Sequence, residues 1–273
     1  MIQLGLIGYP LGHSLSPVIH DAALKACGLE GDYSLFPIHP NDQQGLKRLL
    51  IRVRSGEIHG LNVTIPHKQN VIPLLDDLTS TVQVIGAVNT IWMQNGKLIG
   101  DNTDASGFLA DLKRFLGKWR EESTKQKSVL VLGAGGSARA VVYALVNDDW
   151  DVTIAARRIE QAEKLASHFA QHTMHYPNLK PSAFDLIVNT IPLGMHPNTD
   201  ASPWPDNLPF PSNAAVYDLV YNPRETKLVC DARIAGLPAT TSLGMLIMQA
   251  ALAFEIWTGC NPPRATLWDA VEN

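Results

Sequence analysis

The sequence is poor in the features that mark several large classes of protein. Its 273 residues include three cysteines, Cys27, Cys230 and Cys260, whose wide spacing matches no metal-binding motif. An odd number of scattered cysteines favours a reducing compartment over a disulfide framework. Lysine and arginine total 22 against 26 acidic residues, so composition excludes a strongly basic protein. We therefore expect no metal, no disulfide framework and no nucleic-acid partner.

Long apolar runs are also absent. No stretch reaches the roughly 18 apolar residues that a membrane-spanning helix needs. The first ten residues, MIQLGLIGYP, lack the basic start of a signal peptide, and their apolar run is too short. We therefore expect a cytoplasmic protein without a membrane partner. The sequence does not give the oligomeric state, and our expectation is a monomer or a homodimer. Hydrophobic residues make up 45% of the chain, which is enough to form the cores of two domains.

Apolar runs alternate with amphipathic segments, which predicts an α/β fold with mainly parallel sheets. In the first half we expect strands at 4–8, 33–38 and 59–65, helices at 17–27 and 41–55, helical sequence from Pro66 onward, and two strands flanking the Asn95-Gly96 turn. In the second half we expect strands at 129–132, 152–155, 185–190 and 216–220, and helices at 137–146, 160–170 and, as the last, 245–257. The polar run 119–126 and the proline-rich segment 192–211 are predicted loops.

A glycine-rich segment, GAGGSAR, begins at Gly133, directly after an apolar strand and at the start of an Ala/Val-rich helix. This context is typical of a dinucleotide-binding turn. Gly133 permits the tight turn, Gly135 lets the backbone approach a pyrophosphate, and Ala138 occupies the position where a glycine or alanine packs closely. The helix amides would face the anion. A plain tight turn between strand and helix is the alternative.

The end of the next strand indicates which dinucleotide binds. A site for NAD places an acidic residue there, about 20 residues on, to bind the ribose 2′-hydroxyl. Here the strand ends in Arg157 and Arg158, no acid follows until Glu160, and Asp151 lies at the opposite end of the strand. Because two guanidinium groups suit a 2′-phosphate, the sequence favours NADP. Two solvated surface arginines are the alternative.

The loop GHSLSP, residues 12–17, presents two hydroxyl groups close together. It nearly matches the G-x-S-x-G nucleophile elbow around Ser14, but Ser16 replaces the last glycine and Pro17 follows. This mismatch argues against a hydrolase. We expect Ser14 and Ser16 to bind a polar ligand, with capping of the following helix as the alternative.

Further polar residues stand at strand ends and helix starts. The segment GLNVTIPHK places Asn62 and Thr64 on one side of a strand and Lys68 just beyond it. Asn89 begins a strand and Asp104 precedes a helix. Open α/β sheets bind ligands at such positions. The alternatives are a solvated surface lysine and an N-capping aspartate.

Together these motifs resemble the shikimate dehydrogenase family, in the family's order and over nearly the whole chain. The matching segments are SLSP at 14–17, NVTIPHK at 62–68, GAVNT at 86–90, NTD at 102–104, GAGGSAR at 133–139, NTIPLGM at 189–195, DLVYNP at 218–223 and LGMLIMQAA at 243–251. The resemblance implies reversible, NADP-dependent reduction of 3-dehydroshikimate to shikimate, a step in aromatic amino acid biosynthesis.

The resemblance also implies an architecture and a set of site residues. It implies a substrate-binding α/β lobe at 1–103 and 242–273 and a Rossmann-like, doubly wound NADP lobe at 104–241. The implied catalytic pair is Lys68 and Asp104. The implied substrate-binding residues are Ser14 and Ser16 on the carboxylate, and Asn62, Thr64, Asn89, Tyr221 and Gln249. The implied cofactor-binding residues are Gly133, Ala134, Gly135, Gly136, Ser137, Ala138, Arg157, Arg158, Thr190, Leu219, Ser242 and Met245.

The chain departs from the family's pattern at the cofactor site. Ala156 and Arg158 replace the Asn and Thr that usually flank the phosphate-binding arginine, and Gln161 replaces a further arginine. Arg158 is expected to compensate for that arginine. Ser242 replaces a glycine near the expected nicotinamide contact.

The expected chemistry needs a proton donor or acceptor at the reacting oxygen. Lys68 as an ammonium can stabilise alkoxide charge or protonate a carbonyl oxygen, while Asp104 orients it. The sequence leaves open which of the two is the formal base. No metal is required, and His168, His172 and His175 are interpreted as an exposed helix face.

Two alternatives remain for the function. One is a quinate/shikimate dehydrogenase that accepts NAD, against which the two arginines argue. The other is a non-catalytic ligand sensor on the same fold, against which the retained Lys68 and Asp104 argue.

Overall fold

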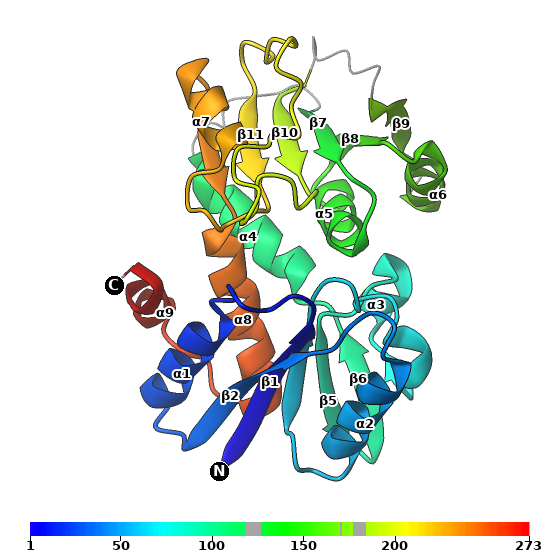
Figure 1. Cartoon of the computed structure of the whole chain (residues 1–273), viewed down its shortest axis with the longest axis vertical. Helices are drawn as coiled ribbons and strands as arrows, with labels where there is room; N and C mark the ends of the chain where they lie inside the picture. Colours follow the sequence, from blue (N-terminus) through cyan, green and yellow to red (C-terminus); the bar gives the residue numbers. More distant parts are fainter. Residues whose placement is uncertain (118–126, 170, 177–183, 273) are drawn as a thin grey trace. The chain divides into compact units, whose positions relative to one another are not determined.

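The computed structural model describes residues 1–117, 127–169, 171–176 and 184–272, which form two compact units (Figure 1). Unit 1 comprises Met1–Gly107 and Leu246–Asn273, and unit 2 comprises Phe108–Met245. Each unit contains a six-stranded sheet. The predicted loop at 119–126 lies outside the described residues.

The sheet of unit 1 is mixed, with the strand order β2-β1-β3-β5-β6-β4. Strand β1 (Ile2–Gly8) lies between β2 (Gly31–Pro37) and β3 (Gly60–Val63), and all three are parallel. Strand β5 (Thr90–Gln94) is antiparallel to β3 and to β6 (Lys97–Asp101), whereas β4 (Asp77–Leu78) is parallel to β6. Five of these six strands therefore run in one direction and β5 is reversed, so the expectation of a mainly parallel sheet is confirmed for this unit. The Asn95-Gly96 turn, with both φ angles positive, reverses the chain as a hairpin.

Helices of unit 1 pack against this sheet. They are α1 (Ser16–Ala26), α2 (Gln43–Arg54) and α3 (Ser80–Ile85). Helix α9 (Arg264–Glu272) packs on α1, and a 3₁₀ turn, η1 (Ile72–Leu74), precedes β4. The predicted helix from Pro66 onward is absent, because residues 65–70 form turns that lead into η1. A helix continuing from Pro66 would lose the hydrogen bond to the Gln69 carbonyl, because Pro73 has no N–H to donate. The prediction that the last helix ends near Trp257 was also wrong, because α9 follows.

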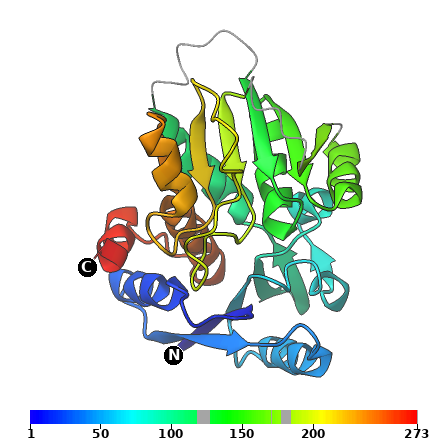
Figure 2. The same cartoon turned by 45° about the horizontal axis from the view of Figure 1, so that its top comes forward.

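The sheet of unit 2 is fully parallel, with the order β12-β11-β10-β7-β8-β9. Its strands are β7 (Lys127–Leu132), β8 (Trp150–Ala156), β9 (His172–His175), β10 (Leu186–Asn189), β11 (Ala215–Asp218) and β12 (Ala239–Thr241). Figure 2 shows these strands side by side, with α5 (Gly136–Val146), α6 (Ile159–Phe169) and α7 (Lys227–Ile234) packed around them. The strand order reverses next to β7, which is the switch point where doubly wound sheets bind ligands.

Two helices contribute residues to both units. Helix α4 (Asp104–Leu116) begins in unit 1, and α8 (Leu243–Thr258) begins in unit 2. Among the described residues, no helix is long and apolar enough to cross a membrane.

Cys27 and Cys260 form a disulfide, so the expectation of a chain without one was wrong. Cys27 ends α1 and Cys260 follows α8, and their Cα atoms lie 6.4 Å apart. The two residues are 233 positions apart in sequence, but both belong to unit 1, which is assembled from the two ends of the chain. Wide spacing along the chain therefore did not imply distance in space. Cys230 is a free thiol.

Candidate active site

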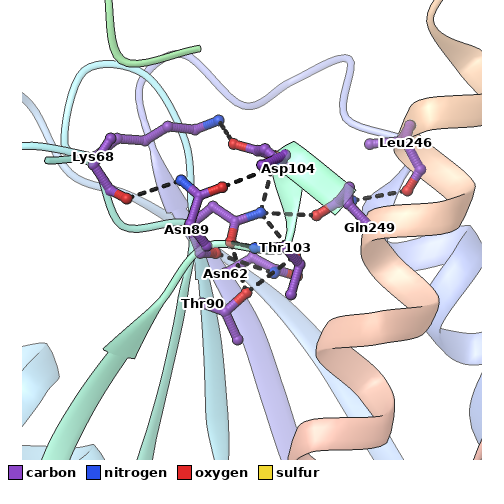
Figure 3. Close-up of polar contacts among 11 residues, drawn as sticks. Asn62, Lys68, Asn89, Thr90, Thr103, Asp104, Leu246 and Gln249 are labelled. Atoms are coloured by element: carbon purple, nitrogen blue, oxygen red, sulfur yellow. Dashed lines mark hydrogen bonds and ion pairs between the residues drawn. The ribbon is translucent and has the colours of Figure 1, made fainter. Parts of the chain in front are cut away.

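Lys68 and Asp104 form a buried ion pair in unit 1. The Lys68 Nζ atom lies 2.5 Å from Asp104 Oδ2, and the two side chains are 11% and 6% exposed. Lys68 lies in the turn after β3, and Asp104 is the first residue of α4 (Figure 3). The alternative of a solvated lysine is excluded by this burial. The other alternative was an N-capping aspartate. The backbone N–H of Ala105, in the first turn of α4, donates to the side chain of Asn102 rather than to Asp104.

Asn89 holds the second oxygen of the Asp104 carboxylate. Its Nδ2 atom lies 2.9 Å from Asp104 Oδ1, 2.9 Å from Thr103 Oγ1 and 3.2 Å from Gln249 Oε1. Its Oδ1 atom accepts from the backbone N–H of Thr103 at 2.8 Å. Figure 3 shows these side chains converging at the start of β5. Since an amide nitrogen has two hydrogens, its three acceptors compete for them.

Gln249 reaches Asn89 from helix α8, which passes very close to α4. A Cβ atom on Gly107 would lie 2.8 Å from both the backbone nitrogen and the Cβ of Gln249. Real Cβ atoms essentially never come so close, so this crossing requires glycine. The Gln249 Nε2 atom donates to the Leu246 carbonyl at 2.8 Å, which orients the amide with its oxygen toward Asn89.

Asn62 lies next to this network, but both of its amide atoms are used within the protein. Its Oδ1 accepts from the Tyr33 hydroxyl at 2.8 Å, and its Nδ2 donates to the Asn89 carbonyl at 3.2 Å. Tyr33 stacks on His20, with ring centroids 4.2 Å apart. Sequence reasoning missed Tyr33 and His20, since a buried aromatic residue gives no signal that separates it from ordinary core. Thr64, expected beside Asn62 on the strand, lies just beyond the end of β3.

Ser14 and Ser16 adjoin the start of α1. The Ser14 Oγ atom accepts from the backbone N–H of Ser16 at 3.2 Å. Leu15 holds the N-cap position of α1, and no side chain caps the helix there. Ser16 is buried and Ser14 is half-buried. The two predicted hydroxyls adjoin each other, with Ser14 in the loop and Ser16 at the first position of α1, and neither serine caps the helix.

The glycine-rich turn of unit 2 has the backbone that its sequence predicted. Gly133 has φ +111°, and a Cβ atom there would lie 2.5 Å from Thr190 Oγ1. The Thr190 hydroxyl in turn donates to the Leu132 carbonyl at 2.7 Å. Gly135 is the N-cap of α5, has no capping side chain, and faces open space, since a Cβ there would meet no atom within 4 Å. The start of α5, from Gly136, is therefore accessible to an anion.

Arg157 and Arg158 follow β8 directly and are both exposed. Burial raises the pKa of the Tyr176 hydroxyl, and the positive charge of Arg157 partly offsets this rise. Glu160, the first acid after the strand, lies in the first turn of α6. The strand end therefore presents cationic groups where a site for NAD would present a carboxylate.

Asn189 and Asp218 connect the ends of β10 and β11. The Asn189 Nδ2 atom donates to Asp218 Oδ1 at 2.8 Å, and the Thr226 hydroxyl donates to Asp218 Oδ2 at 2.6 Å. Burial raises the pKa of Asp218 to about 6, although hydrogen bonds from Thr226, Val220 and Asn189 act to lower it. Sequence reasoning did not name these two residues as site candidates. Each is a polar residue at the end of an apolar strand, and this pattern could have identified them.

The remaining expected cofactor residues also lie in unit 2. Leu219 follows β11, and its carbonyl accepts from the Ser242 hydroxyl at 2.6 Å. Met245 is buried near the start of α8. Tyr221, expected to contact substrate, is half-buried and belongs to unit 2 rather than unit 1.

The three histidines considered as a metal site do not share a helix face. His168 lies in α6, whereas His172 and His175 lie in strand β9, so that interpretation was wrong for the second and third. Helix α6 ends at Phe169, before either of them. Across the described ranges, no three histidine, cysteine or acidic side chains are grouped closely enough to hold a metal ion.

The chain matches three family models. They describe a shikimate dehydrogenase substrate binding domain over residues 6–91, a shikimate/quinate 5-dehydrogenase over 116–189, and a shikimate 5′-dehydrogenase C-terminal domain over 243–272. Together these matches touch both units.

Individual relatives match nearly the full chain. An NADP(+) shikimate dehydrogenase of Carboxydothermus hydrogenoformans is 40% identical over 98% of this chain and 95% of its own. The Thermus thermophilus enzyme, solved with NADP(H) and shikimate, superposes with a TM-score of 0.87 at 37% identity, covering 100% of this chain and 99% of that one. A quinate dehydrogenase of Corynebacterium glutamicum, solved with NAD, gives 0.85 at 32% identity, covering 99% and 98%. By sequence and by fold, the chain belongs to the shikimate dehydrogenase family.

Proposed function

We propose that the chain catalyses the reversible, NADP-dependent reduction of 3-dehydroshikimate to shikimate. It is an oxidoreductase acting on a secondary alcohol, as its NADP(+)-dependent relatives of about 40% identity are. The observation that carries the proposal in the structure is the buried Lys68–Asp104 pair, surrounded by amide and hydroxyl groups suited to a polyhydroxylated ligand.

Oxidation of a secondary alcohol removes a hydride from carbon and a proton from oxygen. NADP⁺, when bound, supplies the hydride acceptor. We assign to Lys68 the hydrogen bond to the reacting oxygen of the substrate. Its ammonium carries three N–H donors, one of which is used by Asp104. A donor at the reacting oxygen stabilises the alkoxide as it forms, and in the reverse direction it gives a proton to the carbonyl oxygen. Asp104 holds the ammonium in place and stabilises its charge within a largely desolvated site.

Recognition of the substrate hydroxyls is assigned to Thr64, Asn89 and Gln249. The Asn89 amide has more acceptors than hydrogens, so the Gln249 oxygen can turn to a ligand hydroxyl with little loss. Ser14 and Ser16 are assigned to the substrate carboxylate, because two adjacent hydroxyls can both donate to it.

Asn62 and Tyr221 complete the proposed substrate set. We give Asn62 an indirect role, because its amide already bonds to Tyr33 and to the Asn89 backbone. Tyr221 supplies a hydroxyl from the loop after β11.

The residues of unit 2 fit NADP. The open backbone at Gly135 and the uncapped start of α5 suit a pyrophosphate, and Gly133 adopts a φ angle that other residues avoid. Arg157 and Arg158 would hold the 2′-phosphate, and Ala134, Gly136, Ser137 and Ala138 belong to the same turn. We assign Thr190, Leu219, Ser242 and Met245 to the nicotinamide half of the cofactor. The domain roles follow, with substrate binding at 1–103 and 242–273 and NADP binding at 104–241.

The test is a spectrophotometric assay of the purified chain with shikimate or quinate and with NADP or NAD. We expect NADPH to form from shikimate, with much weaker activity for quinate and for NAD. Preference for quinate with NAD would support the function named for the Corynebacterium glutamicum relative instead. Binding of shikimate without turnover in any combination would indicate a ligand sensor. Native molecular mass and cell fractionation test the proposed monomer or homodimer and the proposed cytoplasmic location.

A further inference from the structure

His67, the residue before Lys68, is completely buried and hydrogen-bonded through only one ring nitrogen. Its Nε2 atom lies 2.7 Å from the carbonyl oxygen of Ile38. Its Nδ1 atom is buried and has no hydrogen-bond partner in the part of the chain that the structure describes. Because a carbonyl can only accept, the proton lies on Nε2, and Nδ1 is a bare acceptor. The ring is therefore held in one tautomer by one contact.

The acceptor of this bond lies at the edge of the unit 1 sheet where β2 ends. Ile38 follows β2 directly, and its own N–H donates to the carbonyl of Gly8, the last residue of β1, at 3.0 Å. The Ile38 side chain is buried in the same hydrophobic core as Leu46 and Val63. The Ile38 carbonyl is thus held where β1 and β2 end. The hydrogen bond from His67 connects the turn after β3 to this position.

The segment that carries Lys68 is joined to β1 at its start, where the Thr64 N–H donates to the Ile7 carbonyl at 2.8 Å. Residues 64–71, between β3 and η1, belong to no helix or strand. The His67 N–H donates to the Thr64 carbonyl at 2.9 Å, and the Lys68 carbonyl accepts from the Val88 N–H at 2.7 Å. The first of these bonds is internal to the turn. The Val88 bond connects the backbone of residue 68 to the chain before β5, and the ring of His67 connects residue 67 to the end of β2.

We propose that His67 is a positioning residue for Lys68, and that its Nε2–H bond to Ile38 fixes the turn so that the Lys68 ammonium meets Asp104 in the reactive arrangement. The inference rests on the proposed catalytic role of Lys68. Loss of the bond leaves the Ile38 carbonyl without its donor and lets the turn relax. A misplacement of about 1 Å can lower a rate about hundredfold while leaving the groups that bind substrate in place.

The single nitrogen contact permits a sharply matched pair of variants. In His67→Gln the amide nitrogen reaches the position of Nε2, whereas in His67→Asn it reaches the position of Nδ1, which has no partner. His67→Phe keeps an aromatic ring and removes both nitrogens. We expect kcat for shikimate to fall about tenfold to hundredfold in the Asn and Phe variants, with KM changed less than about threefold, and to remain within about threefold of wild type in His67→Gln.

A double-mutant cycle with Lys68→Met tests whether His67 acts through Lys68. If it does, adding His67→Phe or His67→Asn to Lys68→Met lowers the residual kcat much less than it lowers that of the wild type. Thermal unfolding of each variant identifies those that fail to fold. If His67→Phe does not fold, the comparison of His67→Asn with His67→Gln, which are both polar and similar in size, tests the inference.

The outcomes are distinguishable from those of the proposed function. Full activity of Lys68→Met overturns the catalytic role of Lys68 and this inference with it. A severe loss in Lys68→Met beside wild-type kcat in His67→Asn and His67→Phe overturns this inference alone. Equal losses from His67→Phe in the wild-type and Lys68→Met backgrounds, or equal losses in the Asn and Gln variants, also overturn it, because they indicate a general effect on the fold.

Discussion

Gly107 of α4 faces the backbone of Gln249 of α8 so closely that a single added methyl group would lie 2.8 Å from the Gln249 nitrogen. This contact decides how near the Gln249 amide comes to Asn89 and, through Asn89, to Asp104. A small residue at this crossing is thus tied to the geometry of the proposed substrate site.

Gly107→Ala is expected to weaken substrate binding. The added Cβ forces α4 and α8 apart, and such overpacking costs about 1–3 kcal/mol of folding stability. Because Gln249 then withdraws from the site, KM for shikimate should rise several-fold, by more than the KM for NADP. Ser106→Ala is the matched control, since Ser106 is the exposed neighbour on the same helix. Steady-state kinetics and thermal unfolding check both, and an unchanged KM for shikimate in a folded Gly107→Ala protein would contradict the prediction.

Lys68 and Asp104 should behave as one catalytic unit. Lys68→Met keeps the apolar stem and removes the charge, so kcat should fall by about 10²–10⁴ with little change in KM. Asp104→Asn should also lower kcat, because Lys68 then loses the carboxylate 2.5 Å away. Since each residue acts through the other, the double variant should lose clearly less than the two single losses combined. Additive losses in rate would instead assign the two residues independent roles.

Arg157 is expected to select the cofactor. A charge-assisted hydrogen bond is worth about 1.5–3 kcal/mol, so Arg157→Ala should raise KM for NADP roughly 10- to 100-fold and leave that for NAD nearly unchanged. Arg158→Ala measures how far the second exposed guanidinium contributes. The measurement is kcat/KM for each cofactor at saturating shikimate. Equal efficiency of the wild-type enzyme with NADP and NAD would remove the basis of this prediction.

Local motifs were the features that the sequence predicted best. The turn at Gly133 and the strand ending before Arg157 depend on neighbours within a few positions, so composition and spacing carried the information. The fully parallel sheet of unit 2 followed from the regular alternation of strands and helices. Polar residues at strand ends also marked the region where Lys68 and Asp104 meet, 36 positions apart.

Long-range contacts of ordinary side chains were not predictable. The His67 ring bonds to the backbone oxygen of Ile38. Because every residue has such an oxygen, the amino acid at position 38 does not indicate the bond. Tyr33 and Asn62 are 29 positions apart and belong to separate strands, so only the parallel pairing around β1 brings them together. Helix α9 has only two buried side chains, Leu267 and Val271, and this is too weak a periodicity to predict a helix.

The Cys27–Cys260 disulfide should stabilise the folded chain measurably. A bridge that closes a loop of this length, with its cysteines 233 positions apart, restricts the unfolded chain strongly, and typical disulfides contribute about 2–4 kcal/mol. Dithiothreitol should therefore lower the midpoint of denaturant unfolding. Cys27→Ser with Cys260→Ser should remove this dependence on reductant, whereas Cys230→Ser should keep it. Three titratable thiols in the folded, unreduced protein would show that the bridge does not form.

His20 should make the protein sensitive to acid. Complete burial lowers the pKa of its imidazole from 6.5 to about 3. Between pH 6.5 and pH 3, His20 is therefore protonated in the unfolded chain and neutral in the folded chain. Stability contributed by the neutral ring is thus present above pH 6.5 and is lost as the pH falls toward 3, by on the order of 5 kcal/mol in the limit. Asp218 acts in the opposite direction, because its pKa is raised from 3.8 to about 6, and its protonation stabilises the fold as the pH falls through that window.

The two opposing contributions can be separated by substitution. His20→Phe keeps a ring stacked on Tyr33 and cannot titrate, so its unfolding free energy should fall less steeply between about pH 6.5 and pH 4 than that of the wild type. Asp218→Asn should have the reverse effect, with a steeper fall over the same range. His59→Gln replaces an exposed histidine and serves as the control for loss of an imidazole that is not buried. Urea denaturation at half-unit pH intervals provides the measurement. Identical pH profiles for His20→Phe and the wild type would contradict the prediction, because they would mean that His20 has the same pKa in the folded and unfolded states.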